Sequence, residues 1–274
     1  MQRTRSLVLL TTIAVAVAPL LASVPAGADQ APSPGSRVAG SVEMFLAMNG
    51  GRHRPGDRVR AFGNSGRSNL RAVVVTRRGG KATRARSVHR GWAVRTPRAS
   101  RTGVPPRAAI IVTNRGRRDT LRPGIQAFRF GADYRLNAAS EGVRDDGDNL
   151  IQRGAYANRG QYKIELDNSR PRCRVKGTAG EAYAFAGRPL PRRQWYRAVC
   201  SRSGNTINLK VWRLGPRRNT LVVNRTDSNA IGAVRFARRW PLSIGGRVQL
   251  RGVIPVGHND AFNGVVDRAF FDRR

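Results

Sequence analysis

The sequence predicts an all-β protein, a sandwich of two antiparallel sheets held by one disulfide. From Ser41 to the C-terminus, short runs of alternating apolar and polar residues are separated by Gly, Pro and Asn turns. No window in this region repeats its apolar residues at helical spacing. The only two cysteines, Cys173 and Cys200, both fall within strand-like runs. Together these observations favour a sandwich or barrel over any helical fold.

The first 28 residues have the features of a secretory signal peptide. Arg3 and Arg5 precede a mostly apolar run over residues 7–21, and Ala26-Gly27-Ala28 matches a small-residue cleavage site. A membrane anchor is the alternative, but a spanning helix needs about 20 apolar residues. We therefore expect a mature protein that begins near residue 29 and is secreted.

The remaining length suits one large all-β domain. About 246 residues follow the cleavage site (274 − 28), which could also form two average domains. Residues 29–40 are rich in Pro, Ser, Gly and Ala, which predicts a flexible linker. Because no linker or internal repeat follows, we expect a single sandwich over residues 41–274.

Turn residues divide this region into short expected strands. These are Val42–Met48, Leu70–Arg77, Ala108–Asn114, Ala127–Leu136, Asn149–Gln152, Gln161–Asp167, Arg172–Lys176, Trp195–Arg202, Thr206–Arg213, Pro241–Ile244, Arg247–Arg251 and Gly264–Phe271. Gly79-Gly80 is a hairpin signal after the second strand. Ser203-Gly204-Asn205 turns the chain between the eighth and ninth strands.

Alternation assigns the side chains of each strand to a face of its sheet. Along residues 161–167, Glu165 and Asp167 point away from the core. Along residues 206–213, Trp212 points outward. Cys173 and Cys200 fall on inward faces, 27 positions apart (200 − 173), which suits a buried bridge in an exported chain.

The chain is strongly basic, with a formal net charge of +35 that falls to about +33 without Arg3 and Arg5 (35 − 2). Nearly all of the basic residues are arginines, which make bidentate contacts with phosphate, sulfate and carboxylate groups. The charge forms no compact run and is not interleaved with aromatic residues, so specific nucleic-acid binding is not indicated. Two interpretations stay open: a coding and solubility bias, or a site for polyanions.

Six motifs follow one another along the C-terminal half: NLIQRG at 149–154, QYKIEL at 161–166, CRVKG at 173–177, WYR at 195–197, SIGG at 243–246 and FNGVVD at 262–267. In this order they resemble the laminin G-like, concanavalin A-type domains of secreted actinobacterial proteins. The N-terminal half resembles them less sharply, with Val42-Glu43-Met44 as the first strand and 91–97 as a later one. The resemblance implies a concanavalin A-like jelly roll whose first and last strands pair.

The same resemblance suggests where a metal could bind. Related sandwiches hold a structural Ca²⁺ between their first and last strands, which would make Glu43 and Asp267 its ligands here. A second candidate is the acidic cluster 145–149 (DDGDN), which could hold Ca²⁺ or form a polar turn. The histidines His53, His89 and His258 are isolated, so no zinc spacing is present.

Catalytic motifs are absent from the sequence. The glucanases of this fold use an E-x-D-x-x-E motif, and none of the four glutamates lies in one. Glu165 and Asp167 could mimic a carboxylate pair, but a solvated face beside Lys163 explains them better. The sequence also has no G-x-S-x-G elbow and no G-x-x-x-x-G-K-[ST] phosphate loop.

The expected function is therefore a secreted, non-catalytic, lectin-like binding module. Domains of the resembled family bind glycans, proteins or sulfated polymers, and the basic charge favours an acidic surface polymer such as a teichoic or uronic acid chain. Trp212 is the candidate for stacking on the ligand, although it could instead be an edge contact within the sandwich. A glycoside hydrolase on the same fold and a nonspecific polyanion binder remain the alternatives.

Overall fold

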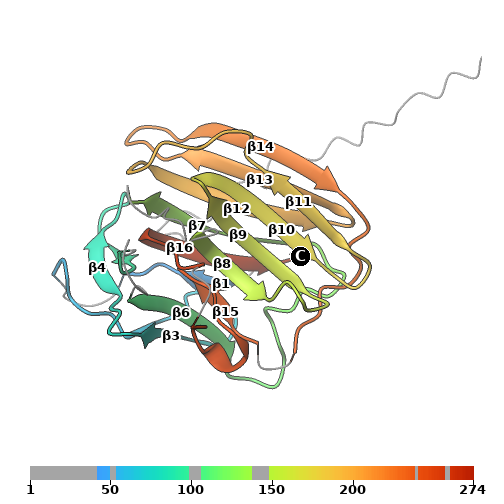
Figure 1. The fold of residues 1–274 in the computed structure, drawn as a ribbon, viewed down its shortest axis with the longest axis horizontal. Coiled ribbons are helices and arrows are strands. Elements are labelled where there is room, and N and C mark those ends of the chain that lie inside the picture. The colour runs from blue at the N-terminus through green and yellow to red at the C-terminus, as the bar shows by residue number, and fades with distance from the viewer. Residues whose placement is uncertain (1–41, 50–53, 99–105, 138–147, 238–239, 257–259) are drawn as a thin grey trace, which may run out of the picture. The chain divides into compact units, whose positions relative to one another are not determined.

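The computed structural model describes residues 42–49, 54–98, 106–137, 148–237, 240–256 and 260–274. In these residues it has two eight-stranded antiparallel sheets and one short 3₁₀ helix, η1 (Leu250–Gly252) (Figure 1). The expected signal peptide (1–28) and linker (29–40) lie outside the described residues. Within the described residues, no helix is long and apolar enough to cross a membrane.

The first sheet, here called sheet A, contains the N- and C-terminal strands. In spatial order its strands are β14 (Thr220–Ser228), β13 (Thr206–Arg213), β12 (Trp195–Ser203), β7 (Phe128–Leu136), β16 (Gly264–Arg273), β5 (Trp92–Arg95) and β4 (Thr83–Arg86), with β1 (Val42–Leu46) also paired to β16. The pairing of β1 with β16 confirms that the first and last strands are neighbours.

The second sheet, sheet B, faces the viewer in Figure 1. Its strands are β11 (Glu181–Phe185), β10 (Arg170–Lys176), β9 (Gln161–Asp167), β8 (Asp148–Gly154), β15 (Leu242–Ile244), β6 (Arg107–Asn114), β3 (Leu70–Arg77) and β2 (Ala61–Phe62). From β5 to β8 the chain alternates between the sheets, strand by strand. This is the concanavalin A-like jelly-roll sandwich that the sequence predicted.

Aromatic rings from both sheets meet in the core. Tyr162 of sheet B packs against Phe128, Phe130 and Phe271 of sheet A, with ring centroids 4.8–5.5 Å apart. Its hydroxyl donates a hydrogen bond to the Leu121 carbonyl, so the ring is buried without an unpaired polar group. Each such ring pair contributes roughly 0.5–1.5 kcal/mol beyond the area it buries.

The two cysteines form the predicted disulfide, and both are fully buried. Cys173 lies in β10 of sheet B and Cys200 in β12 of sheet A, with their Cα atoms 5.9 Å apart. The bridge therefore joins the two sheets through the core.

Two sequence predictions about local structure are wrong. The Gly79-Gly80 turn forms, but it leads from β3 in sheet B to β4 in sheet A and makes no hairpin. A Cβ on Gly80 would come within 2.0 Å of the Arg107 carbonyl oxygen, because the chain passes tightly over β6 there. Residues 247–251 form no strand, because Arg251 and Gly252 have φ values of 68° and 79°, outside the extended region.

The sequence also missed four strands, β2, β4, β11 and β14, all of which lie at edges of the sheets. In β11 only the small residues Ala182 and Ala184 face the core, so the apolar signal is weak. In β14 only Val223 is buried, and a bulge opposite β13 breaks the alternation. Edge strands with so little buried surface lack the periodicity that identifies a strand.

Candidate functional site

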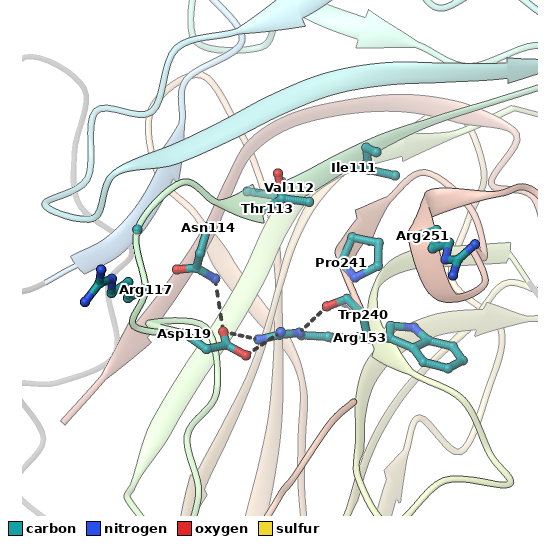
Figure 2. Close-up of a pocket in the computed structure, with 11 residues that line it drawn as sticks. Ile111, Val112, Thr113, Asn114, Arg117, Asp119, Arg153, Trp240, Pro241 and Arg251 are labelled. Atoms are coloured by element: carbon teal, nitrogen blue, oxygen red, sulfur yellow. Dashed lines mark hydrogen bonds and ion pairs between the residues drawn. The ribbon is translucent and has the colours of Figure 1, made fainter. Parts of the chain in front are cut away.

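A pocket of about 380 Å³ opens at one end of strands β6, β8 and β15 (Figure 2). Its lining residues are Ile111, Val112, Thr113, Asn114, Gly116, Arg117, Asp119, Arg153, Trp240, Pro241 and Arg251. Strand β6 and the loop after it supply one side, while Trp240 and Pro241 precede β15. We refer to it as the Trp240 pocket.

A partly buried ion pair forms one wall of this pocket. Arg153 donates from both terminal nitrogens to the two carboxylate oxygens of Asp119, over 2.8 and 2.7 Å. Its Nε donates to the Trp240 carbonyl over 3.0 Å, and its guanidinium lies 4.5 Å from the Phe236 ring centroid. Asn114 also donates to Asp119 over 3.0 Å. A bidentate pair of this kind satisfies a buried charge and makes the wall rigid.

Two further arginines at the pocket have no such partner. Arg117 and Arg251 are exposed, and neither side chain has a hydrogen bond or ion pair with the residues that the structure describes. With Arg153 and Asp119 counted, the lining carries a net charge of +2 (3 − 1). The pocket therefore has donors available for an anion.

Trp240 is the aromatic side chain of the pocket. It is half-buried, packs against the core and also lines the cavity beside Pro241. An indole ring in the same pocket as guanidinium groups can contact the flat face of a ring-shaped ligand, while the arginines contact its acid group. Sequence reasoning missed Trp240, because it lies in a loop where alternation assigns no face.

The turn that carries Arg251 is held against sheet B. Arg251 has φ 68° and the adjacent Gly252 has φ 79°, two consecutive left-handed residues. A Cβ on Gly252 would come within 2.7 Å of the Ile111 side chain, so this glycine allows the turn to lie on β6. For arginine the left-handed conformation costs on the order of 1 kcal/mol, and such strain is concentrated at functional sites.

Trp212 lies elsewhere, on the outer face of sheet A. Its neighbours in β13 alternate between buried and partly exposed as predicted, and Trp212 itself is half-buried. Its Cα partners on the adjacent strands are Arg197 and Leu221. It does not line the Trp240 pocket, and stacking of a ligand on Trp212 stays a prediction.

Glu165 and Asp167 lie on the outer face of sheet B, where the sequence placed them. Glu165 pairs with Lys163, and Asp167 pairs with Arg172. Each carboxylate thus has its own cation. Glu165 is only 7% exposed, however, so it does not lie on the solvated face that the sequence predicted.

The structure does not bring Glu43 and Asp267 together, although their strands pair. Glu43 lies opposite Phe271 and Asp272 at one end of β16, and its carboxylate accepts hydrogen bonds from Arg67 and from the Arg273 backbone. The β16 residues that pair with β1 run from Asp272 to Ala269, so Asp267 lies outside this pairing. Within the described residues no three His, Cys, Asp or Glu side chains form a group that could hold a metal ion. Calcium binding at these two residues stays a prediction.

The acidic cluster and two of the histidines lie partly or wholly outside the described residues. Residues 145–147, His53 and His258 are outside them. Asp148 accepts a hydrogen bond from the Asn263 backbone, and Asn149 donates to Gln152.

His89 is part of a charged network on the outer face of sheet A. It contacts Asp133 over 2.6 Å, and Arg197 binds the same carboxylate through two nitrogens over 2.7 and 2.9 Å. Burial by itself would raise the pKa of Asp133, but the hydrogen bonds from Arg197 and His89 hold it below its usual value. Burial raises the pKa of the neighbouring Asp267 to about 6, against hydrogen bonds from Ser87 and the Arg268 backbone.

Comparison with one solved structure supports the fold, and a second structure aligns less closely. The binding domain of Paraclostridial Mosquitocidal Protein 1 aligns with a TM-score of 0.52 and 10% identity over 85% of this chain, which spans about half (49%) of that chain. The LG1-3 region of the laminin alpha2 chain aligns with a TM-score of 0.41 and 8% identity, over 85% of this chain and 68% of that one. No family model and no curated protein matches the sequence. At such low identity the likeness concerns the fold alone.

Proposed function

We propose that the protein is a secreted, non-catalytic module that binds an acidic extracellular polysaccharide in the Trp240 pocket. The observation that carries the proposal is that one pocket is lined by a half-buried indole and by two exposed arginines that have no partner among the described residues. A uronic acid, sulfated or phosphate-bearing sugar combines the ring and the anion that these groups would contact.

The chemistry of the remaining candidates supports binding over hydrolysis. A glycosidase needs two carboxyl groups that flank the bond to be cleaved. Glu165 and Asp167 are each ion-paired with a cation of their own. A disulfide through the core is consistent with export, since such bonds persist in oxidising compartments.

The test is a binding titration with acidic polysaccharides, namely polygalacturonate, alginate and a teichoic acid, together with methyl-esterified polygalacturonate. The methyl ester keeps the backbone and removes the charge. We expect one acidic polymer to bind, its ester to bind at least tenfold more weakly, and Trp240→Ala to lower the affinity about tenfold. Arg117→Ala and Arg251→Ala should each weaken binding and reduce its dependence on salt.

Trp212→Ala is the matched control, because it removes the same ring from a different surface. It should bind like the wild type. Equal binding of every polyanion, lost alike in all variants at high salt, would instead favour nonspecific attraction by the net charge. Reducing ends released from a polysaccharide would favour the hydrolase.

A further inference from the structure

A second aromatic surface lies at the far side of sheet B from β6. Tyr183 and Phe185 of β11 point outward, since the alternate residues Ala182 and Ala184 face the core. Tyr156, in the turn between β8 and β9, is 61% exposed and Phe185 is 51% exposed. With Arg172, Arg174 and Lys176 of β10 these rings form what we call the tyrosine strip.

Cations hold the rings of the strip in place. The Arg174 guanidinium lies 4.3 Å from the Tyr156 ring centroid and 5.9 Å from that of Tyr183. Lys176 Nζ lies 4.6 Å from the Tyr156 centroid and donates to the Tyr156 carbonyl over 2.7 Å. Arg172 donates to the Tyr183 hydroxyl over 3.0 Å. Because cations already hold the Tyr156 and Tyr183 rings, a ligand that stacks on these two rings loses little entropy in ordering them.

The strip is almost neutral, unlike the chain as a whole. Arg172 pairs with Asp167, and Arg174 pairs with Glu181 through its Nε over 2.9 Å. The three cations and two carboxylates sum to +1 (3 − 2), in a chain of net charge +35. With both guanidinium groups already bound to carboxylates, the strip is poorly suited to a polyanion.

The edge of sheet B beside the strip is closed. The Tyr183 backbone N–H donates to Asp227 over 2.6 Å, and Asn229 donates to the Glu181 carbonyl over 2.8 Å. Asp227 belongs to β14 of sheet A, and Asn229 is the residue that follows this strand. They occupy backbone groups of β11 that an added strand would use, which disfavours a peptide in β-extension as the ligand.

We infer that the tyrosine strip is a binding platform for an uncharged polysaccharide, separate from the Trp240 pocket. The C–H faces of neutral pyranose rings pack against exposed aromatic rings, while their hydroxyl groups bond to the fixed Arg–carboxylate pairs at the edges. The adjacent rings of Tyr183 and Phe185 have centroids 6.0 Å apart, so together they form a surface larger than one ring. This inference does not rest on the function proposed for the pocket.

The experiment is a pull-down of the purified full chain with insoluble cellulose, chitin and xylan, at 50 mM and 1 M NaCl. We expect one of these uncharged polymers to retain the protein at both salt concentrations. Tyr183→Ala and Phe185→Ala should each weaken retention about tenfold, and Tyr156→Ala should weaken it as well. Tyr183→Phe, which keeps the ring, should bind like the wild type.

Two results would overturn the inference: no retention on any of the three polymers, or ring-deletion variants that bind like the wild type. The Trp240→Ala variant separates this site from the pocket. It should retain full binding to the uncharged polymer, while the tyrosine-strip variants should retain full binding to the acidic one. Far-UV circular dichroism and thermal melting would establish that the variants are folded.

Discussion

Three buried charges form a row across the outer face of sheet A. Arg197 of β12, Asp133 of β7 and Asp267 of β16 are direct neighbours through the register of these strands. Asp133 accepts from both Arg197 and His89, so its negative charge is compensated. Asp267 is buried, accepts hydrogen bonds from Ser87 and from the Arg268 backbone N–H, and lies next to a second carboxylate. Its burial and this neighbour disfavour its charged form.

This difference predicts a pH-dependent stability. The folded pKa of Asp267, about 6, exceeds its ordinary value of 3.8, so the folded state binds more protons than the unfolded state between these pH values. Stability from this group is fully present below about pH 4 and is lost as the pH rises through 6. Asp267→Asn should raise the free energy of unfolding at pH 7.5 by roughly 2–3 kcal/mol and change it little at pH 4. Urea unfolding at both pH values measures this.

Asp133→Asn is the control for that prediction. Because Arg197 and His89 lower the pKa of Asp133, this variant should lose stability at pH 7.5. If Asp267→Asn were also destabilised at pH 7.5, the carboxylate of Asp267 would be charged and compensated in the folded protein.

At the scale of elements, the short helix η1 shows how a local conformation creates the pocket. The run from Arg247 to Arg251 resembles a strand in its residue types, yet two consecutive left-handed residues turn the chain. The turn lies on Ile111 through Gly252 and directs Arg251 to the pocket lining. Arg251 shares its left-handed conformation with Arg78, Arg90, Arg193 and Arg268, but among these five it alone lines the pocket.

Arg251→Gly separates stability from binding. Glycine adopts positive φ without strain but has more freedom in the unfolded chain, so the free energy of unfolding should stay within about 1 kcal/mol of the wild-type value. Binding of the acidic polysaccharide should nevertheless weaken about tenfold, since one guanidinium is lost. Thermal melting and a binding titration measure the two effects. A fall in stability of several kcal/mol would contradict the assignment of strain to this residue.

At the scale of the whole molecule, the disulfide connects the two sheets. It closes a loop with a sequence separation of 27 and joins strands that belong to opposite layers. In the chain-entropy model a loop of this size contributes about 3.5 kcal/mol, chiefly by restricting the unfolded chain. The contribution should therefore appear in stability and not in ligand affinity.

The double variant Cys173→Ala/Cys200→Ala tests this. We expect its free energy of unfolding to fall by about 3–4 kcal/mol, with binding at the Trp240 pocket unchanged at temperatures where it remains folded. Urea unfolding of the variant and of the oxidised and reduced wild type separates the bridge from the packing of the sulfur atoms. Identical curves for the oxidised and reduced wild type would mean that the bridge adds no stability.

Local patterns in the sequence were sufficient for much of the fold. The alternation around Tyr162 and Leu209, the turn at Gly204 and the inward cysteines all depend on near neighbours in the chain, and the structure confirms them. The weak strands β11 and β14 were missed, because strands that bury so few residues carry little periodic signal. The register between strands far apart in the chain cannot be read from local patterns. The register of β1 with β16 decides that Glu43 and Asp267 do not face each other.

The sequence by itself determined the all-β class, a buried disulfide between Cys173 and Cys200 and the outward direction of Trp212. Only the tertiary structure decided which aromatic side chains meet cations that could serve a ligand. Trp240, Arg117 and Arg251 line the same pocket from three different segments of the chain. Arg174 of β10 lies over the ring of Tyr156, which belongs to the turn between β8 and β9. The physical reason is that alternation reports which face of a sheet a residue occupies, whereas a binding site depends on which residues of different elements meet there.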